Sequence, residues 1–163
     1  SLTVTDNIFL GDEKSASLPF IIDKKIQFQK AQEIINTLHM NLPVDSLVEE
    51  LSVSQKQMLE IVKALYRDSK IIIMDEPTKG VDVGAKHQIY EIMRELARDG
   101  YAILMVSSEM PEVIGMSDRV IVMHEGRITL IADTRDAATT QERILEAAVT
   151  RAHIHDSDAE EMP

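Results

Sequence analysis

The chain has 163 residues, with 28 acidic and 17 basic side chains and a formal net charge of −11 at pH 7. Its hydrophobic content of 44% is sufficient for one domain with a core and excludes disorder throughout. The acidic balance argues against binding to nucleic acid or to an anionic membrane surface by charge density. The sequence has no cysteine for disulfides or thiolate metal sites. It has no apolar run approaching the roughly 18 residues of a membrane-spanning helix.

The first part of the chain is predicted to be helical. A short helix is expected at about Asp6, with Thr5 or Asp6 as its N-cap. Residues 23–40 place apolar side chains at roughly helical spacing, and Pro43 closes that segment. The opening stretch SLTVTDNIFLG resembles the interior of a domain, so we expect the chain to begin inside a larger one.

The clearest helix is predicted over residues 52–68, where apolar side chains recur at i, i+3, i+4 and i+7. Ser52 and Gln55 form a capping-box pattern that starts this helix at Ser52. The N–H groups of a first turn have no partner inside the helix, so this end favours anions, phosphate included. Locally, an ordinary N-cap explains the same residues equally well.

Two strands separated by a helix are predicted next. The run IIIM at residues 71–74 is rich in β-branched side chains and is typical of a strand buried on both faces of a parallel sheet. Residues 102–108 form the second strand. Residues 84–98 between them have helical periodicity, and Gly100 is suited to end that helix. This order predicts an α/β layer with parallel strands.

The last part of the chain is predicted to form a hairpin and a helix. Residues 120–131 have the pattern of a β-hairpin that turns at Glu125–Gly126. A helix over residues 139–149 is expected to begin with a second capping box, formed by Thr139 and Glu142.

Asp75 and Glu76 directly follow the first predicted strand. In open α/β sheets, ligands bind at the carboxyl ends of the strands. One carboxylate there can hold Mg²⁺ through water, and the next can orient an attacking water, which suits phosphoryl chemistry. Solvated acids before a proline turn explain these residues about as well. The helix start at Ser52, about twenty residues earlier, adds a second phosphate-related feature and favours the first interpretation.

Several segments, in order, resemble the motifs of ATP-binding cassette (ABC) ATPases over roughly residues 1–150. LSVSQKQMLEIVKAL resembles their signature segment, IIIMDEP their Walker B strand and KGVD their D-loop. AILMVSSEMPEVIGMSDRVIVMHEGRI resembles the stretch that holds their switch histidine and then the antiparallel hairpin. Ordered motifs at the right separations are far more specific than any one of them alone.

The similarity is greatest to the tandem-cassette ATPases of bacterial monosaccharide importers of the ribose and galactose type. LTVTDNIFLG and the signature segment resemble their first cassette. DEPTKGVDVGAK, SSEMPEV and TTQERILEAA resemble their second cassette, so we hypothesise a splice near residues 75–78, of the kind an internal deletion would produce.

The resemblance implies a fold of the α/β class: a P-loop NTPase-like ABC cassette with a partial parallel sheet flanked by helices and a C-terminal β-hairpin. The ATP-binding domain would span residues 1–150. A helical signature region would cover about 1–68, and the Walker B strand with the remaining core would cover about 69–150. Residues 151–163 would be a polar tail.

By position, the resemblance also implies roles for individual residues, with ATP and Mg²⁺ as cofactors. Asp75 would be the Mg²⁺-associated aspartate and Glu76 the catalytic glutamate. Asp82 would be the D-loop aspartate that meets the opposite site, and Ser108 stands where the switch histidine is expected. The residues that would cap the γ-phosphate of a nucleotide held by a partner cassette are Ser52, Val53, Ser54 and Gln55.

Three departures from the family's pattern bear on activity. No G-x-x-x-x-G-K-[ST] phosphate cradle occurs; GVDVGAK at residues 80–86 has a misplaced first glycine and follows the acid strand. Without a cradle the β- and γ-phosphates lose their main ligands, so we expect negligible ATPase activity from this chain alone. Val53–Ser54 replaces two glycines, and Ser108 cannot carry a proton charge near neutral pH as histidine can.

The missing cradle elements would also leave sheet edges and apolar faces uncovered, which predicts poor solubility or dependence on a partner.

The implied protein is an ATP-binding subunit of a bacterial ABC importer for a monosaccharide, peripheral on the cytoplasmic face of the inner membrane. Its implied partners are a second cassette in a head-to-tail dimer, the transporter's membrane subunits and, indirectly, a sugar-binding protein. No nucleic-acid partner is expected.

Other interpretations stay open. The chain would alternatively be an inactive truncated cassette that acts as a binding or regulatory module, or a non-functional remnant. DNA-repair and chromosome-maintenance ATPases share the signature and Walker B motifs, but they need long coiled coils and no sustained heptad occurs here. His153 and His155, with Asp156 and Asp158, are interpreted as a solvated tail rather than a metal site.

Overall fold

The computed structural model describes residues 2–11 and 24–149. Within them the chain forms two compact units, divided between Val106 and Ser107, and each is described by itself. The predicted histidine-containing tail lies outside the described residues. None of the described helices combines the length and the apolar character needed to cross a membrane.

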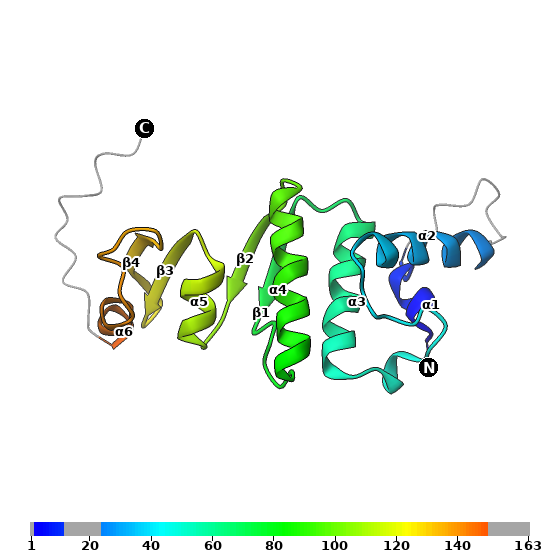
Figure 1. Ribbon diagram of the computed structural model, residues 1–163, viewed down its shortest axis with the longest axis horizontal. Coiled ribbons are helices and arrows are strands. Elements are labelled where there is room, and N and C mark those ends of the chain that lie inside the picture. The colour runs from blue at the N-terminus through cyan, green and yellow to red at the C-terminus, as the bar shows by residue number, and fades with distance from the viewer. Residues whose placement is uncertain (1, 12–23, 150–163) are drawn as a thin grey trace. The chain divides into compact units, whose positions relative to one another are not determined.

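The first unit contains a group of helices and a pair of parallel strands (Figure 1). Its elements are α1 (Val4–Ile8), α2 (Lys24–Thr37), the 3-10 helix η1 (Val48–Glu50), α3 (Val53–Tyr66), β1 (Ile71–Asp75), α4 (Val83–Arg98) and β2 (Ala102–Val106). Helices α1, α2 and α3 pack on one another, and α4 packs against both α3 and β2. Helix α4 therefore joins the helical group to the strands.

Capping residues set the helix ends of this unit. The predicted capping box at the start of α3 is confirmed, with Ser52 as N-cap and Gln55 as its partner. The predicted cap of α1 was wrong: Thr3 is the N-cap, because its hydroxyl accepts the N–H of Asp6 while the Asp6 carboxylate accepts the N–H of Thr3. Helix α4 ends at Arg98, and Gly100 stops it as predicted, with a φ of +88° that glycine adopts without steric cost.

The parallel pairing of β1 and β2 is confirmed, but the predicted burial on both faces was wrong. The register joins Ile71 to Ala102 and Ile73 to Leu104, so these side chains share one face. That face is exposed: Ile73 is 69% exposed, whereas the neighbouring Ile72 is 4% exposed. The described residues cover the sheet from one side only, so alternation leaves every second apolar side chain in solvent.

The second unit contains α5 (Met110–Met116), β3 (Arg119–His124), β4 (Arg127–Asp133) and α6 (Gln141–Val149). Strands β3 and β4 form the predicted antiparallel hairpin. Glu125 and Gly126 both have positive φ, as a two-residue type I′ turn requires. The buried core of this unit is Val120, Val122 and Ile144.

Two further predictions, one for the end of β2 and one for the start of α6, need correction. The strand expected over 102–108 ends at Val106, because the Ser107 hydroxyl accepts the N–H of Glu109 and begins the approach to α5. The capping residue of α6 is Thr140 rather than Thr139, since the Thr140 hydroxyl accepts the N–H of Arg143. Thr139 is buried instead and donates its hydroxyl to the Asp133 carbonyl.

Candidate functional site

The predicted acid pair lies at the carboxyl end of β1. Asp75 is the last residue of the strand, pairs in register with Val106 and is exposed. Because side chains alternate along a strand, Asp75 lies on the same face as Ile71 and Ile73. Its carboxylate is therefore available to a ligand at the strand end.

Glu76 continues the pairing by one residue and then turns the chain. Its N–H donates to the Val106 carbonyl over 2.8 Å, and its φ is +46°. A left-handed conformation is unfavourable for glutamate by about 1–3 kcal/mol and persists only where its surroundings hold it. Here Pro77 and Thr78, the next two residues, are fully buried, and Lys79 donates its N–H to the Glu76 carbonyl. The half-buried Glu76 is thus fixed by a rigid turn.

Asp82 caps α4. Its Oδ1 accepts the N–H of Ala85 over 3.0 Å, so its carboxylate satisfies one of the free donors of the first turn. The helix consequently begins at Val83, one residue earlier than its periodicity predicts. Sequence reasoning gave Asp82 only a role toward a partner and missed this cap, although an aspartate directly before a helical pattern is a recognised start signal.

The tip of α3 presents backbone donors, while two of its side chains are engaged locally. Ser52 Oγ accepts the N–H of Gln55 and lies 2.9 Å from Ser54 Oγ. Gln55 accepts the N–H of Ser52 and donates to the Asn41 carbonyl. Within the described part of the chain, the N–H groups of Val53 and Ser54 have no acceptor. Val53 is 55% exposed, so its side chain stands beside these donors.

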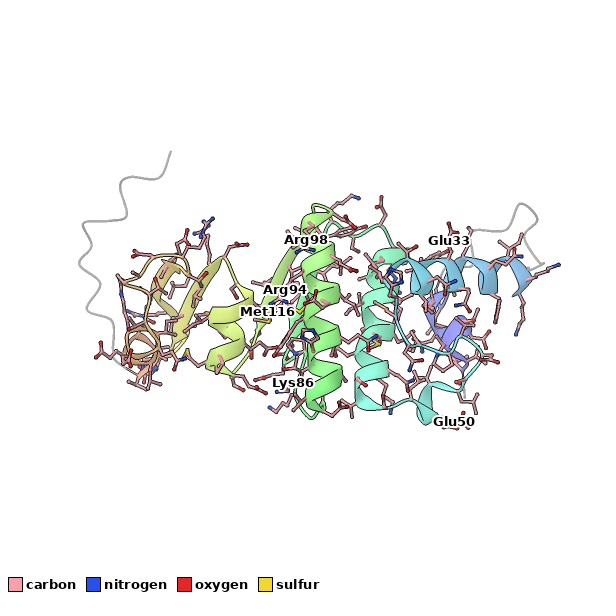
Figure 2. All side chains as sticks on the ribbon, viewed as in Figure 1. Glu33, Glu50, Lys86, Arg94, Arg98 and Met116 are labelled. Atoms are coloured by element: carbon pink, nitrogen blue, oxygen red, sulfur yellow. The ribbon has the colours of Figure 1, made fainter. Side chains whose placement is uncertain are left out.

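The tip of α3 and the acid pair lie at the same end of the first unit. Figure 1 shows β1 running opposite in direction to both α3 and α4, which brings the start of each helix to the carboxyl end of the strand. Figure 2 places Glu50, just before α3, and Lys86, in the first turn of α4, at that end, with Arg98 at the other. Seven of the eight predicted site residues therefore share one end of one unit.

Ser108 belongs to the second unit. It is exposed and lies between Ser107 and Glu109, in the turn before α5. Sequence analysis did not predict α5, although Pro111 and Glu112 in its first turn match the residue preferences of a helix start.

The residues present fit the outer part of a magnesium–nucleotide site. Carboxylate oxygens such as those of Asp75 are suitable Mg²⁺ ligands. Among the described residues no group of three or more histidine, aspartate or glutamate side chains is placed to hold a metal. A cation at Asp75 would therefore take its other ligands from water and from a nucleotide's phosphates, which is the usual coordination of Mg²⁺ with nucleotides.

Comparison with known proteins agrees with the resemblance to ABC ATPases. The ABC transporter family model matches residues 1–79. Over 129 residues, or 78% of this chain, the xylose import ATP-binding protein XylG of Geobacillus kaustophilus is 44% identical. The ribose import ATP-binding protein RbsA 1 of Rubrobacter xylanophilus is 42% identical over 88% of the chain. The arabinose import ATP-binding protein AraG of Pectobacterium atrosepticum is 38% identical over 91%. The chain spans 25%, 29% and 29% of these three relatives.

Solved structures agree on the fold. A nucleotide-free ATP-binding cassette from an ABC transporter superposes with a TM-score of 0.73 at 25% identity, over 92% of this chain and 64% of that one. The protein cbiO1 from Clostridium perfringens, part of the ABC transporter complex cbiONQ, superposes with a TM-score of 0.67 at 23% identity, over 91% of this chain and 55% of that one. Motifs, relatives and fold therefore agree that the chain resembles the ATP-binding cassettes of ABC transporters and has their fold.

Proposed function

We propose that this chain is part of an ATP-binding subunit of a bacterial ABC importer for a monosaccharide. The observation that carries the proposal is 38–44% identity, over most of the chain, to proteins named for the import of xylose, ribose and arabinose. The chain spans under a third of each of them, so transport and its partners are part of the proposal.

The residues at the end of β1 would serve the chain's own nucleotide site. Asp75, exposed at the strand end, would hold Mg²⁺ through water. Glu76 would orient the attacking water, and the N–H bond to Val106 fixes its backbone for that task. Bound Mg-ATP would supply the γ-phosphoryl group whose transfer to water drives transport. Asp82 would extend toward the opposite site from the start of α4.

The tip of α3 would serve a nucleotide held by another cassette. The N–H groups of Val53 and Ser54, which have no acceptor among the described residues, would donate to its γ-phosphate, and the capping box keeps the helix start in place. The Val53 side chain replaces a glycine, so it limits how closely the backbone approaches the phosphate. Ser108, in the switch position, would donate a hydroxyl hydrogen bond but carry no charge.

In this proposal the ATP-binding domain covers residues 1–150, with a helical signature region to about 68 and the core from about 69. The chain would pair head to tail with a second cassette and act on membrane subunits at the cytoplasmic face of the bacterial inner membrane. A sugar-binding protein would communicate with it only through those subunits.

The test is nucleotide-dependent pairing. The chain is mixed with an intact cassette that carries G-x-x-x-x-G-K-[ST], from a ribose importer, and complex formation is measured by analytical ultracentrifugation with and without Mg-ATP. The proposal expects a complex that depends on Mg-ATP. Absence of a complex under both conditions would contradict it.

A matched pair of variants locates the contact. Ser54→Asp puts a negative charge at the start of α3 and should abolish pairing by repelling the phosphate. The same charge should not destabilise the helix, because acidic side chains in a first turn interact favourably with the helix dipole. Ser69→Asp makes the same charge change beyond the other end of α3 and should leave pairing unchanged. Equal effects of the two variants would argue against a phosphate at the tip.

A second candidate is a non-catalytic module that binds an intact cassette and regulates it. The absence of a phosphate cradle from the sequence favours it. A module of this kind would pair without nucleotide and would tolerate Glu76→Gln, whereas the first proposal requires Mg-ATP for pairing.

A further inference from the structure

One ionisable side chain is buried among the described residues, and it lies outside the acid pair. Glu112, in the first turn of α5, is 4% exposed. Removing a carboxylate from water is unfavourable unless hydrogen bonds or opposite charges compensate it. No buried side-chain nitrogen or oxygen in the described residues lacks a hydrogen-bond partner, so Glu112 is compensated.

One part of this compensation comes from the turn that precedes α5. The Ser107 hydroxyl donates to Glu112 Oε2 and accepts the N–H of Glu109 over 3.0 Å. Glu109 is the N-cap residue of α5 and has no side-chain cap bond of its own. In a standard capping box, the third helical residue accepts the N-cap N–H directly. Here the Ser107 hydroxyl stands between the two groups and relays that interaction.

The residues of this relay flank Ser108 on both sides in the sequence. Ser107 is half-buried and tied to Glu112, while Glu109 is tied back to Ser107, so the residue between them is held outward and exposed. Two further bonds, from the N–H groups of Glu112 and Val113 to the Glu109 carbonyl, fix the first turn of the helix.

Helix α5 is itself anchored in the core of the second unit. Met110, Val113 and Ile114 pack against the buried cluster of the hairpin and α6. A continuous set of contacts thus runs from that cluster through α5 and the Glu112 carboxylate to the turn at Ser107–Glu109.

We infer that Glu112 is a positioning residue: acting through Ser107, it sets the backbone of the turn that presents Ser108. The importance of Ser108 rests on the proposed function, but the placement of its turn does not. The tests below need no nucleotide, so their failure is distinguishable from a failure of the proposed function.

The first test is amide hydrogen exchange in the full chain. In the intact protein the Glu109 amide should be protected. Ser107→Ala and Glu112→Ala should each accelerate its exchange about five- to tenfold, the factor expected for one lost hydrogen bond. Ser107→Thr keeps the hydroxyl and should restore protection. The control is the Thr139 amide, which donates to the Asp136 carbonyl in a turn of the same unit and should be unaffected.

The second test reads Ser108 directly. The chain has no cysteine, so Ser108→Cys introduces a unique thiol whose rate of reaction with dithionitrobenzoate can be measured. Adding Glu112→Ala should release the turn and lower that rate several-fold, because the thiol is no longer held outward. Ala137→Cys, at an exposed position of the same unit, is the matched control and should react at the same rate with or without Glu112→Ala.

Three outcomes would overturn the inference. The Glu109 amide exchanges without protection in the intact chain; or Ser107→Ala leaves the exchange rate of that amide unchanged; or the Glu109 and Thr139 amides accelerate equally, which means general destabilisation. If Glu112→Ala does not fold, Ser107→Ala and the intact chain still decide the question.

Discussion

The uncovered face of the β1–β2 pair leads to a sharp prediction about neighbouring isoleucines. Ile72 and Ile73 are adjacent in one strand and have the same side chain, but they are 4% and 69% exposed. Replacing each by alanine removes the same atoms from opposite faces of the sheet. Any difference in the effect on stability therefore reports burial alone.

The magnitudes follow from those exposures. A fully buried isoleucine truncated to alanine costs about 2–5 kcal/mol, so Ile72→Ala should lower the free energy of unfolding by that amount. Ile73 buries about a third of its surface, and full burial of such a side chain contributes about 1.5–3 kcal/mol. Ile73→Ala should consequently cost less than about 1 kcal/mol. Urea unfolding of both variants, monitored by far-ultraviolet circular dichroism, measures the difference.

As a control, the unfolding of both variants is measured at low and at high protein concentration. If Ile73→Ala is as costly as Ile72→Ala in dilute solution, a part of the chain covers the outer face and the one-sided sheet is incorrect. If Ile73→Ala becomes costly only at high concentration, copies associate through that face, in agreement with the expected poor solubility.

Further predictions concern helix ends and one ion pair. Gly100→Ala should destabilise the protein by about 1 kcal/mol because φ at Gly100 is +88°. Gly115→Ala, inside α5 with free space around it, should be neutral or stabilising by up to about 1 kcal/mol. Thermal unfolding of the two variants distinguishes these effects. Ser52→Ala removes the cap of α3 and should cost about 1 kcal/mol without preventing folding, as measured in urea. Bonds from the Arg135 side chain and backbone lower the pKa of Asp133 to about 2, so this interaction is complete above about pH 4 and is lost as the pH falls through 2. Arg135→Gln should raise that pKa toward 3.8, and a carboxyl titration by nuclear magnetic resonance that finds no change would contradict this.

Periodicity and turn chemistry were sufficient to predict most of the elements. The capping box of Ser52, the stop of α4 by Gly100 and the turn at Glu125–Gly126 depend on interactions within a few residues, and all are confirmed. Parallel pairing of the two strands was predictable because a helix separates them.

Several errors arose where contacts outside the local motif decide the structure. The composition of IIIM predicts a strand buried on both faces, but burial depends on which elements the chain supplies, and the described residues cover only one face. Thr140, rather than Thr139, caps α6 because the Thr139 hydroxyl is used by the Asp133 carbonyl. The burial of Glu112 left no sequence signal beyond its place in a helix start.

The sequence predicted where the candidate site residues lie in the fold, but not all of their local hydrogen bonds and backbone conformations. The acids at the end of β1 and the donors at the start of α3 lie at one end of the unit, as the motif order indicates (Figure 1). The capping role of Asp82 was overlooked although an aspartate before a helical pattern signals it, whereas the positive φ of Glu76 required coordinates, since it depends on how the turn after β1 packs.

The central claim is that Asp75 and Glu76 form one side of a nucleotide site that this chain cannot complete alone. The most direct measurement is ATP turnover by the purified chain at millimolar Mg-ATP, compared with its Glu76→Gln variant. We predict no turnover above background for either protein, because the sequence offers the phosphates no cradle. Cassette-like turnover by the chain alone, abolished in Glu76→Gln, would contradict the claim.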